Sequence, residues 1–164
     1  MLDFASGSGR NGDALRRAGL AVVAISDASA SNLPLPEVPD GFAAAISTHG
    51  LLHGTPSDVR SRLDWIARRL EAGALLYATF GSTRDARFGE GTRIDEFTFA
   101  PVEGDERGVA HAYFTRAQVL ALLEPEFEIE SLDEERVDAV AGAWAHRERP
   151  LSRAFHWFAV AQKR

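Results

Sequence analysis

The sequence predicts a single α/β domain built on an open, mostly parallel β-sheet that helices cover on both faces. Three observations lead to this prediction. Short apolar runs of strand length alternate with segments of helical periodicity, most links between them are short, and 164 residues suffice for one hydrophobic core but not for two. We therefore treat residues 1–164 as one domain.

The N-terminal part supplies the first strands of the predicted sheet. Residues 2–4 predict a fragment of a buried strand, and a glycine-rich turn connects them to a helix over residues 10–18. Gly19 is placed to end that helix, because glycine readily adopts the left-handed conformation found after helices. Continuous apolar runs at residues 20–25 and 42–47 predict two buried strands.

Clear helix-start signals follow in the middle of the chain. Residues 55–58 combine an N-cap threonine, a proline in the first turn and an aspartate three residues after the cap, and Gly73 is placed to close this helix. Residues 74–80 predict another buried strand. Residues 81–112 are rich in Gly, Asp and Arg, so we expect a long excursion outside the packed core that carries substrate contacts.

The C-terminal part completes the alternation. A second capping box at residues 115–118 begins a helix that Pro125 terminates. Residues 127–132 predict a short strand. Residues 154–161 are apolar at both alternating positions, which favours a strand in the middle of the sheet.

Composition narrows the possible functions. No apolar run approaches the roughly 18 to 20 residues of a membrane span, and the N-terminus lacks the features of a secretory signal. The absence of cysteine and the scattered positions of the five histidines predict no metal site. A net charge of −6 disfavours nucleic acid as a partner. We expect a cytoplasmic protein that acts on a small molecule, without a membrane or nucleic-acid partner.

The most informative motif joins the first strand to the first helix. Residues 3–9 place Gly7 and Gly9 in a turn where a missing Cβ allows a ligand to approach the backbone, and the helix N-terminus offers free N–H groups. Gly12 completes a G-x-G-x-x-G pattern, which also serves dinucleotides. The carboxylate of Asp3 could accept hydrogen bonds from an ammonium group, which S-adenosylmethionine has where NAD has a pyrophosphate.

Leu2-Asp3 and the run at residues 7–11 resemble the first motif of the class I S-adenosylmethionine-dependent methyltransferases. Residues 42–53 and 70–77 are similar to this family's fourth strand and to the segment before its fifth. The resemblance implies a Rossmann-like fold with a C-terminal antiparallel strand, S-adenosylmethionine as cofactor, and methyl transfer to a small-molecule acceptor. Relatives carry a further strand before the segment that begins at residue 42, and a covering N-terminal segment. We expect a sheet one strand shorter than usual and no such cover.

The resemblance also implies a set of cofactor-binding residues near the carboxyl ends of the strands: Asp3, Ala5, Gly7, Gly9, Asn11, Asp27, Ser47 and Thr48. Ala5 stands where the family's first glycine usually lies, which the turn tolerates if its φ is negative. Asp27 could accept hydrogen bonds from the ribose hydroxyls, or it could simply begin a turn.

Two histidines follow the strand that should point toward the methyl donor. His53 and His49 are the candidate catalytic residues, because an imidazole can orient an acceptor or take its proton. A structural role is the alternative for each, and alignment alone can accelerate transfer to a nucleophilic acceptor. Side chains of the excursion could recognise an anionic or aromatic acceptor or could simply be solvated: Arg84, Arg87, Arg93, His111 and Tyr113.

Two other functions are compatible with the sequence. Asp27 lies at the distance from Gly7 at which a dinucleotide fold keeps its ribose acid, so an NAD-type oxidoreductase is the first alternative. No evident second domain supports it, and Asp3 would have no role. The second alternative is a non-catalytic module that keeps the methyltransferase fold.

Overall fold

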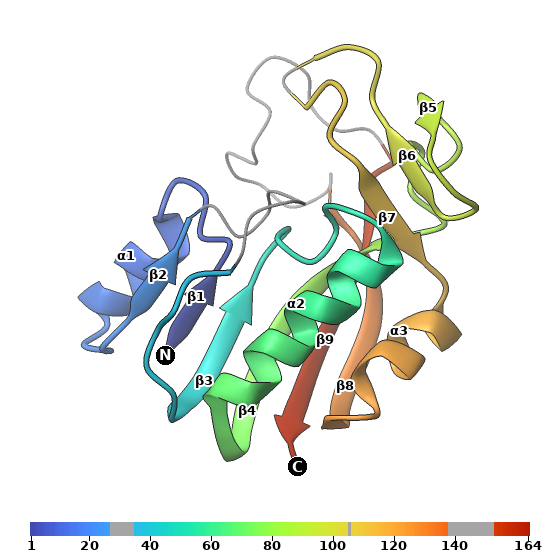
Figure 1. Cartoon of the computed structure of the whole chain (residues 1–164). Coiled ribbons are helices and arrows are strands. Elements are labelled where there is room, and N and C mark those ends of the chain that lie inside the picture. Colours follow the sequence, from blue (N-terminus) through green and yellow to red (C-terminus); the bar gives the residue numbers. More distant parts are fainter. Residues whose placement is uncertain (27–34, 105, 138–152) are drawn as a thin grey trace.

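The computed structural model describes residues 1–26, 35–104, 106–137 and 153–164, and it forms one nine-stranded sheet with helices packed on it (Figure 1). The strands are β1 (Leu2–Phe4), β2 (Val23–Ile25), β3 (Phe42–Ser47), β4 (Leu70–Ser82), β5 (Thr92–Arg93), β6 (Thr98–Ala100), β7 (His111–Phe114), β8 (Phe127–Arg136) and β9 (Phe155–Lys163). The helices in this part of the chain are α1 (Arg10–Arg17), α2 (Pro56–Arg69) and α3 (Arg116–Leu123).

The main part of the sheet is parallel. Strands β2, β1, β3 and β4 lie side by side in that order, and each pairs with its neighbour in parallel. Strand β9 runs antiparallel to the other edge of β4, and β8 runs antiparallel to β9. The predicted mostly parallel sheet with a C-terminal antiparallel strand is therefore confirmed. Residues 35–41 contain neither helix nor strand, so β3 follows β2 directly among the described elements.

Helices cover both faces of the sheet, as predicted. Neighbouring side chains of a strand point to opposite faces. The Phe4 ring packs on Trp65 of α2 with 5.6 Å between centroids, whereas the Asp3 carboxylate faces Gly12 of α1. Helices α2 and α3 share one face, because Arg60 donates hydrogen bonds to the last carbonyls of α3. The largest part of the core lies between that face and these two helices.

Local signals predicted both helix starts correctly. Thr55 and Asp58 form a capping box at α2, and Thr115 and Gln118 form the second one at α3. No helix in the described residues combines the length and the apolarity that crossing a bilayer requires.

Two predictions need correction: the burial of residues 20–25 and the end of the helix that begins at Pro56. Residues 20–25 were expected to be a buried strand, but β2 lies at the sheet edge, and Leu20 is 44% exposed. Gly73 does not close α2. The helix ends at Arg69, β4 begins immediately, and Gly73 has a φ of 82° inside that strand, beside a register shift against β3. The left-handed glycine thus serves a bulge instead of a helix end.

The segment over residues 81–112 is also different from the prediction, because part of it belongs to the sheet. Beyond the end of β3, the edge of β4 pairs with β7 at Gly81 and Ser82, and β7 continues the sheet to β6 and β5. Strand β7 is fully buried. The approach is so close that a Cβ on Gly81 would lie 2.6 Å from the Ala112 carbonyl oxygen. Beyond β3, the edge of β4 would expose unpaired N–H and C=O groups, and pairing with β7 satisfies them.

Candidate functional site

The glycine-rich turn lies at the carboxyl end of β1. The Ser6 N–H donates to the Ile25 carbonyl at 2.9 Å, which fixes the turn to β2. Gly7 and Gly9 have φ angles of 52° and 76°, in the left-handed region that favours glycine. A Cβ built on Gly7 meets no atom of the described residues within 4 Å, so these residues leave open space beside the backbone at this point.

Asp3, in the strand that leads into this turn, carries a buried carboxylate. The residue is 1% exposed, and Oδ2 has no hydrogen-bond partner among the described residues. Burial raises the pKa of Asp3 above its ordinary value, although the Gly12 N–H and the Arg16 guanidinium act in the opposite direction. A Cβ on Gly12 would lie 2.9 Å from Oδ2, so this glycine lets α1 approach the carboxylate. A buried acceptor without a partner can bind a donor of a ligand.

The turn after β1 touches the loop after β3. Asn11 Nδ2 donates to Thr48 Oγ1 at 2.6 Å, and a Cβ on Gly50 would collide with the Cβ of Ala5. The buried Ser47 Oγ has no hydrogen-bond partner in the described structure. The fold therefore brings the predicted cofactor residues together at the carboxyl ends of β1 and β3, where open α/β sheets bind ligands. Asp27 lies outside the described residues.

His49 occupies a constrained, half-buried position in the loop after β3. Its φ is 66°, its backbone N–H donates to Thr79 Oγ1 at 2.9 Å, and its ring packs edge-on against His156 with 5.0 Å between centroids. Burial lowers the pKa of His49 to about 3 and that of His156 to about 4. Both rings are thus neutral near pH 7. A ring with a pKa of about 3 is a weak general base at that pH.

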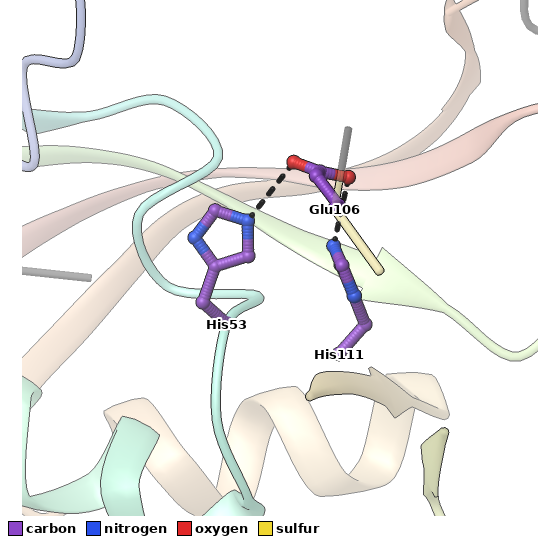
Figure 2. A group of neighbouring side chains, drawn as sticks. All are labelled: His53, Glu106 and His111. Carbon is purple, nitrogen blue, oxygen red and sulfur yellow. Dashed lines mark ion pairs between the residues drawn. The ribbon is translucent and has the colours of Figure 1, made fainter. Parts of the chain in front are cut away.

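His53 faces two residues of the following segment (Figure 2). Its Nε2 lies 3.5 Å from Glu106 Oε1, and His111 Nε2 lies 3.1 Å from the other carboxylate oxygen, Oε2. The rings of His53 and His111 meet edge-on with 4.9 Å between centroids. His111 and His53 hold the pKa of the Glu106 carboxyl well below its usual range, against the effect of burial.

The three candidate arginines of the excursion have partners in the protein. Arg87 forms a two-pronged ion pair with Asp85, with nitrogen–oxygen distances of 2.8 and 2.7 Å. This pair lowers the pKa of the buried Asp85, which also accepts the Phe155 N–H and so ties the segment to β9. Arg84 pairs with Glu134 at 2.6 Å, and Arg93 donates to a backbone carbonyl two residues away. These contacts favour structural roles over recognition of an acceptor.

No family model and no curated protein matches the sequence. Solved structures do match. A methyltransferase described as S-adenosylmethionine-dependent from Methanosarcina mazei is 20% identical, with a TM-score of 0.72 and coverage of 99% of this chain and 91% of the other. One from Mesorhizobium loti is 18% identical, with a TM-score of 0.62 and coverage of 99% and 89%. The chain has the methyltransferase fold.

A third structure with the methyltransferase fold was solved with ligands bound. This enzyme, the 1,6-didemethyltoxoflavin-N1-methyltransferase of Burkholderia thailandensis, contains 1,6-didemethyltoxoflavin and S-adenosylhomocysteine. It is 14% identical, has a TM-score of 0.65, and the match covers 99% of this chain and 69% of that one. The fold that the first sequence motif indicated is therefore confirmed.

Within the methyltransferase fold, sequence reasoning missed Glu106. His111 was considered for acceptor recognition, but nothing in the spacing of Glu106 marked it, because His53, Glu106 and His111 come from separate turns and a strand. The signal that joins them is the pairing of the β3 loop with β7, which includes an isolated bridge between His53 and His111. That long-range pairing is not visible as a local pattern.

Ala5 requires a correction. The sequence analysis made its tolerance depend on a negative φ, but its φ is 57°, in the left-handed region. Alanine in this conformation is strained by roughly 1–2 kcal/mol. The strain explains why glycine is the better residue for this turn.

Replacing Ala5 with glycine is expected to stabilise the protein by about 0.5–1 kcal/mol, because relief of the left-handed strain exceeds the added entropy of the unfolded chain. Urea denaturation measures this difference. Ala18→Gly is the matched control, since Ala18 has a φ of −79° at the end of α1 and gains nothing from glycine. An Ala5→Gly variant as destabilised as Ala18→Gly would contradict the assignment of strain.

Proposed function

We propose that the protein is an S-adenosylmethionine-dependent methyltransferase that acts on a small-molecule acceptor. One observation carries the proposal: in the described residues, the glycine-rich turn leaves open space beside Gly7, and the strand that leads into this turn carries a buried carboxylate oxygen of Asp3 that has no hydrogen-bond partner there. A turn with a purely structural role needs neither feature. The unpaired Oδ2 supports binding of a ligand with hydrogen-bond donors.

The residues present fit the proposed cofactor. Asp3 Oδ2 can accept from an ammonium group, and Ser47 Oγ offers a further buried polar atom at the end of β3. Gly7 and Gly9 leave the backbone accessible, while Ala5 and the hydrogen-bonded pair Asn11 and Thr48 shape the wall between the two loops. Ribose recognition by Asp27 stays a prediction. The chemistry gained from the bound cofactor is an electrophilic methyl group.

The contribution of the protein to catalysis is then the alignment of the acceptor and the exclusion of water. An acid–base role for His53 or His49 stays a prediction, and the low pKa of His49 disfavours it there. A small acceptor is supported by the ligand of the Burkholderia thailandensis enzyme and by the net charge of −6, which disfavours nucleic acid. A cytoplasmic location is part of the same proposal.

Ligand-dependent thermal unfolding tests the cofactor assignment. S-adenosylhomocysteine at a hundred times its dissociation constant should stabilise the native state by about 2.7 kcal/mol, which raises Tm by roughly 5–10 °C for a chain of this size. S-adenosylmethionine should act similarly, and NAD should not. A Tm that stays unchanged up to millimolar S-adenosylhomocysteine, or that rises more with NAD, would contradict the proposal. Binding without turnover in a broad acceptor screen would favour the non-catalytic alternative.

A further inference from the structure

His53, Glu106 and His111 converge from separate segments of the chain (Figure 2). His53 lies in the loop after β3, Glu106 lies between β6 and β7, and His111 begins β7. One ligand atom from each residue, an imidazole nitrogen or a carboxylate oxygen, lies within 4.8 Å of the other two. These three side chains form what we call the His-Glu-His cluster.

Hydrogen bonding fixes how His111 presents its ring. Its Nδ1 lies 2.8 Å from the Val109 carbonyl oxygen, which can only accept, so Nδ1 carries the proton. In a neutral ring, Nε2 then has a lone pair, and this atom faces Glu106 Oε2 at 3.1 Å. Two acceptors at that distance repel each other unless a proton or a metal ion lies between them.

The ring of His53 also faces this carboxylate without a normal hydrogen bond. Both of its ring nitrogens are buried, and neither has a hydrogen-bond partner in the described residues. Its Nε2 is turned toward the same carboxylate at 3.5 Å, which is too long for a normal hydrogen bond. A cation among the three side chains would give the Nε2 atoms of both histidines a partner and would contact the Glu106 carboxylate.

We propose that the His-Glu-His cluster binds one divalent transition-metal ion of the zinc type through His53 Nε2, His111 Nε2 and the Glu106 carboxylate. Zinc bonds of about 2.0–2.2 Å in a tetrahedron place neighbouring ligand atoms roughly 3.3 Å apart. His53 Nε2 lies 3.5 Å from Glu106 Oε1, His111 Nε2 lies 3.1 Å from Oε2, and one ligand atom of each residue lies within 4.8 Å of the other two, so small side-chain shifts bring the three ligands around one ion. Imidazole nitrogen selects zinc and similar ions over magnesium or calcium. Three protein ligands leave a fourth position for an exchangeable ligand.

The backbone around the cluster is held in place without an ion. The Gly54 N–H donates to the Ala110 carbonyl, and the Ala112 N–H donates to the Leu52 carbonyl, both at 2.7 Å. These hydrogen bonds hold the two segments that carry the histidines side by side. The buried Arg62 guanidinium donates to the His53 carbonyl. The Val109 carbonyl orients the ring of His111, as the outer partners of metal-bound histidines do.

The cluster is partly exposed, and the loop that carries His53 also contacts the segment that follows the candidate cofactor turn. The side chains of His53 and Glu106 are 17% and 30% exposed, and Thr48, which bonds to Asn11 of the turn, is five residues before His53. On the proposed methyltransferase function, on which this step alone depends, the ion would bind an oxygen or nitrogen of the acceptor and lower its pKa. The lone pair of His53 would then hold the metal instead of acting as a base.

Zinc titration of the metal-stripped full chain, in competition with a chromophoric chelator, tests the site. Neither cofactor nor acceptor is added, so the result is independent of the proposed function. We expect one zinc ion per chain, no competition by Mg²⁺, and at least about 100-fold weaker binding for Glu106→Gln and His111→Gln, since loss of even an outer partner costs about 10- to 100-fold. The exposed Glu103 lies in the same loop, so Glu103→Gln should bind normally.

Nitrogen NMR of the histidine rings locates the bound ion. Zinc should shift Nε2 of His53 and His111 and leave the rings of His49 and His156 unchanged. The inference is overturned if wild type binds zinc no more tightly than Glu106→Gln, or if zinc shifts other histidines. Circular dichroism of each variant shows whether it is folded, and wild-type binding and NMR decide the question if a variant is not.

Discussion

Gly7→Asn is expected to abolish the stabilisation by S-adenosylhomocysteine and to leave the fold intact. Asparagine tolerates the left-handed conformation that Gly7 adopts, with a φ of 52°, better than other residues with a Cβ. None of the residues that the structure describes has an atom within 4 Å of the new Cβ. The added side chain therefore enters only space that the proposed cofactor needs, and the full shift of about 2.7 kcal/mol at a hundredfold ligand excess should disappear.

The chain offers a matched control for this substitution. Gly19 has a φ of 88° and also has open space around its Cβ position, but it lies after α1, away from the carboxyl ends of the strands. Gly19→Asn should thus melt like Gly7→Asn without ligand and respond to S-adenosylhomocysteine like wild type. Calorimetry on both variants makes the comparison. Normal binding by Gly7→Asn would place the cofactor elsewhere.

Acidification should destabilise the protein through His156. The residue is 3% exposed, and burial lowers its folded pKa to about 4, whereas the unfolded value is about 6.5. As pH falls, the unfolded chain binds the proton first. The stability due to neutral His156 is therefore complete above pH 6.5 and is lost toward pH 4, by about 3 kcal/mol in total.

His156→Phe isolates this contribution. The Nδ1 atom of His156 is buried without a hydrogen-bond partner in the described structure, so an apolar ring of similar shape removes a cost of burial and should be tolerated. Urea denaturation at several values between pH 7.5 and 4 should show a smaller loss of stability for the variant than for wild type, by up to about 3 kcal/mol. Parallel curves would mean that His156 is protonated or solvated in the native state.

Sequence predicted those features that depend on local chemistry. The capping boxes at Thr55 and Thr115 and the turn at Gly7 and Gly9 each need only a few neighbouring residues, and each is in the expected place. The central position of β9 followed from its two apolar faces. These local signals were sufficient to predict the methyltransferase fold.

The features that sequence did not predict depend on pairing between distant segments. The edge position of β2 depends on the whole sheet, because a short apolar sequence predicts a strand equally well at the edge and in the centre. Likewise, β7 joins the sheet only because β4 extends past the end of β3. That extension also creates the His-Glu-His cluster, whose members have no regular spacing in the chain.

The continuity of β4 has a consequence for motion. Its residues pair first with β3 and then with β7, while β9 runs along its opposite edge from Leu75 to Gly81. Rotation of the β7 segment against the β1 and β3 segment would have to bend this thirteen-residue strand and break its hydrogen bonds. We therefore expect no hinge at this junction. Hydrogen exchange should find the amides of Gly81 and Tyr113 among the slowest in the protein, so that small molecules enter by displacement of surface loops.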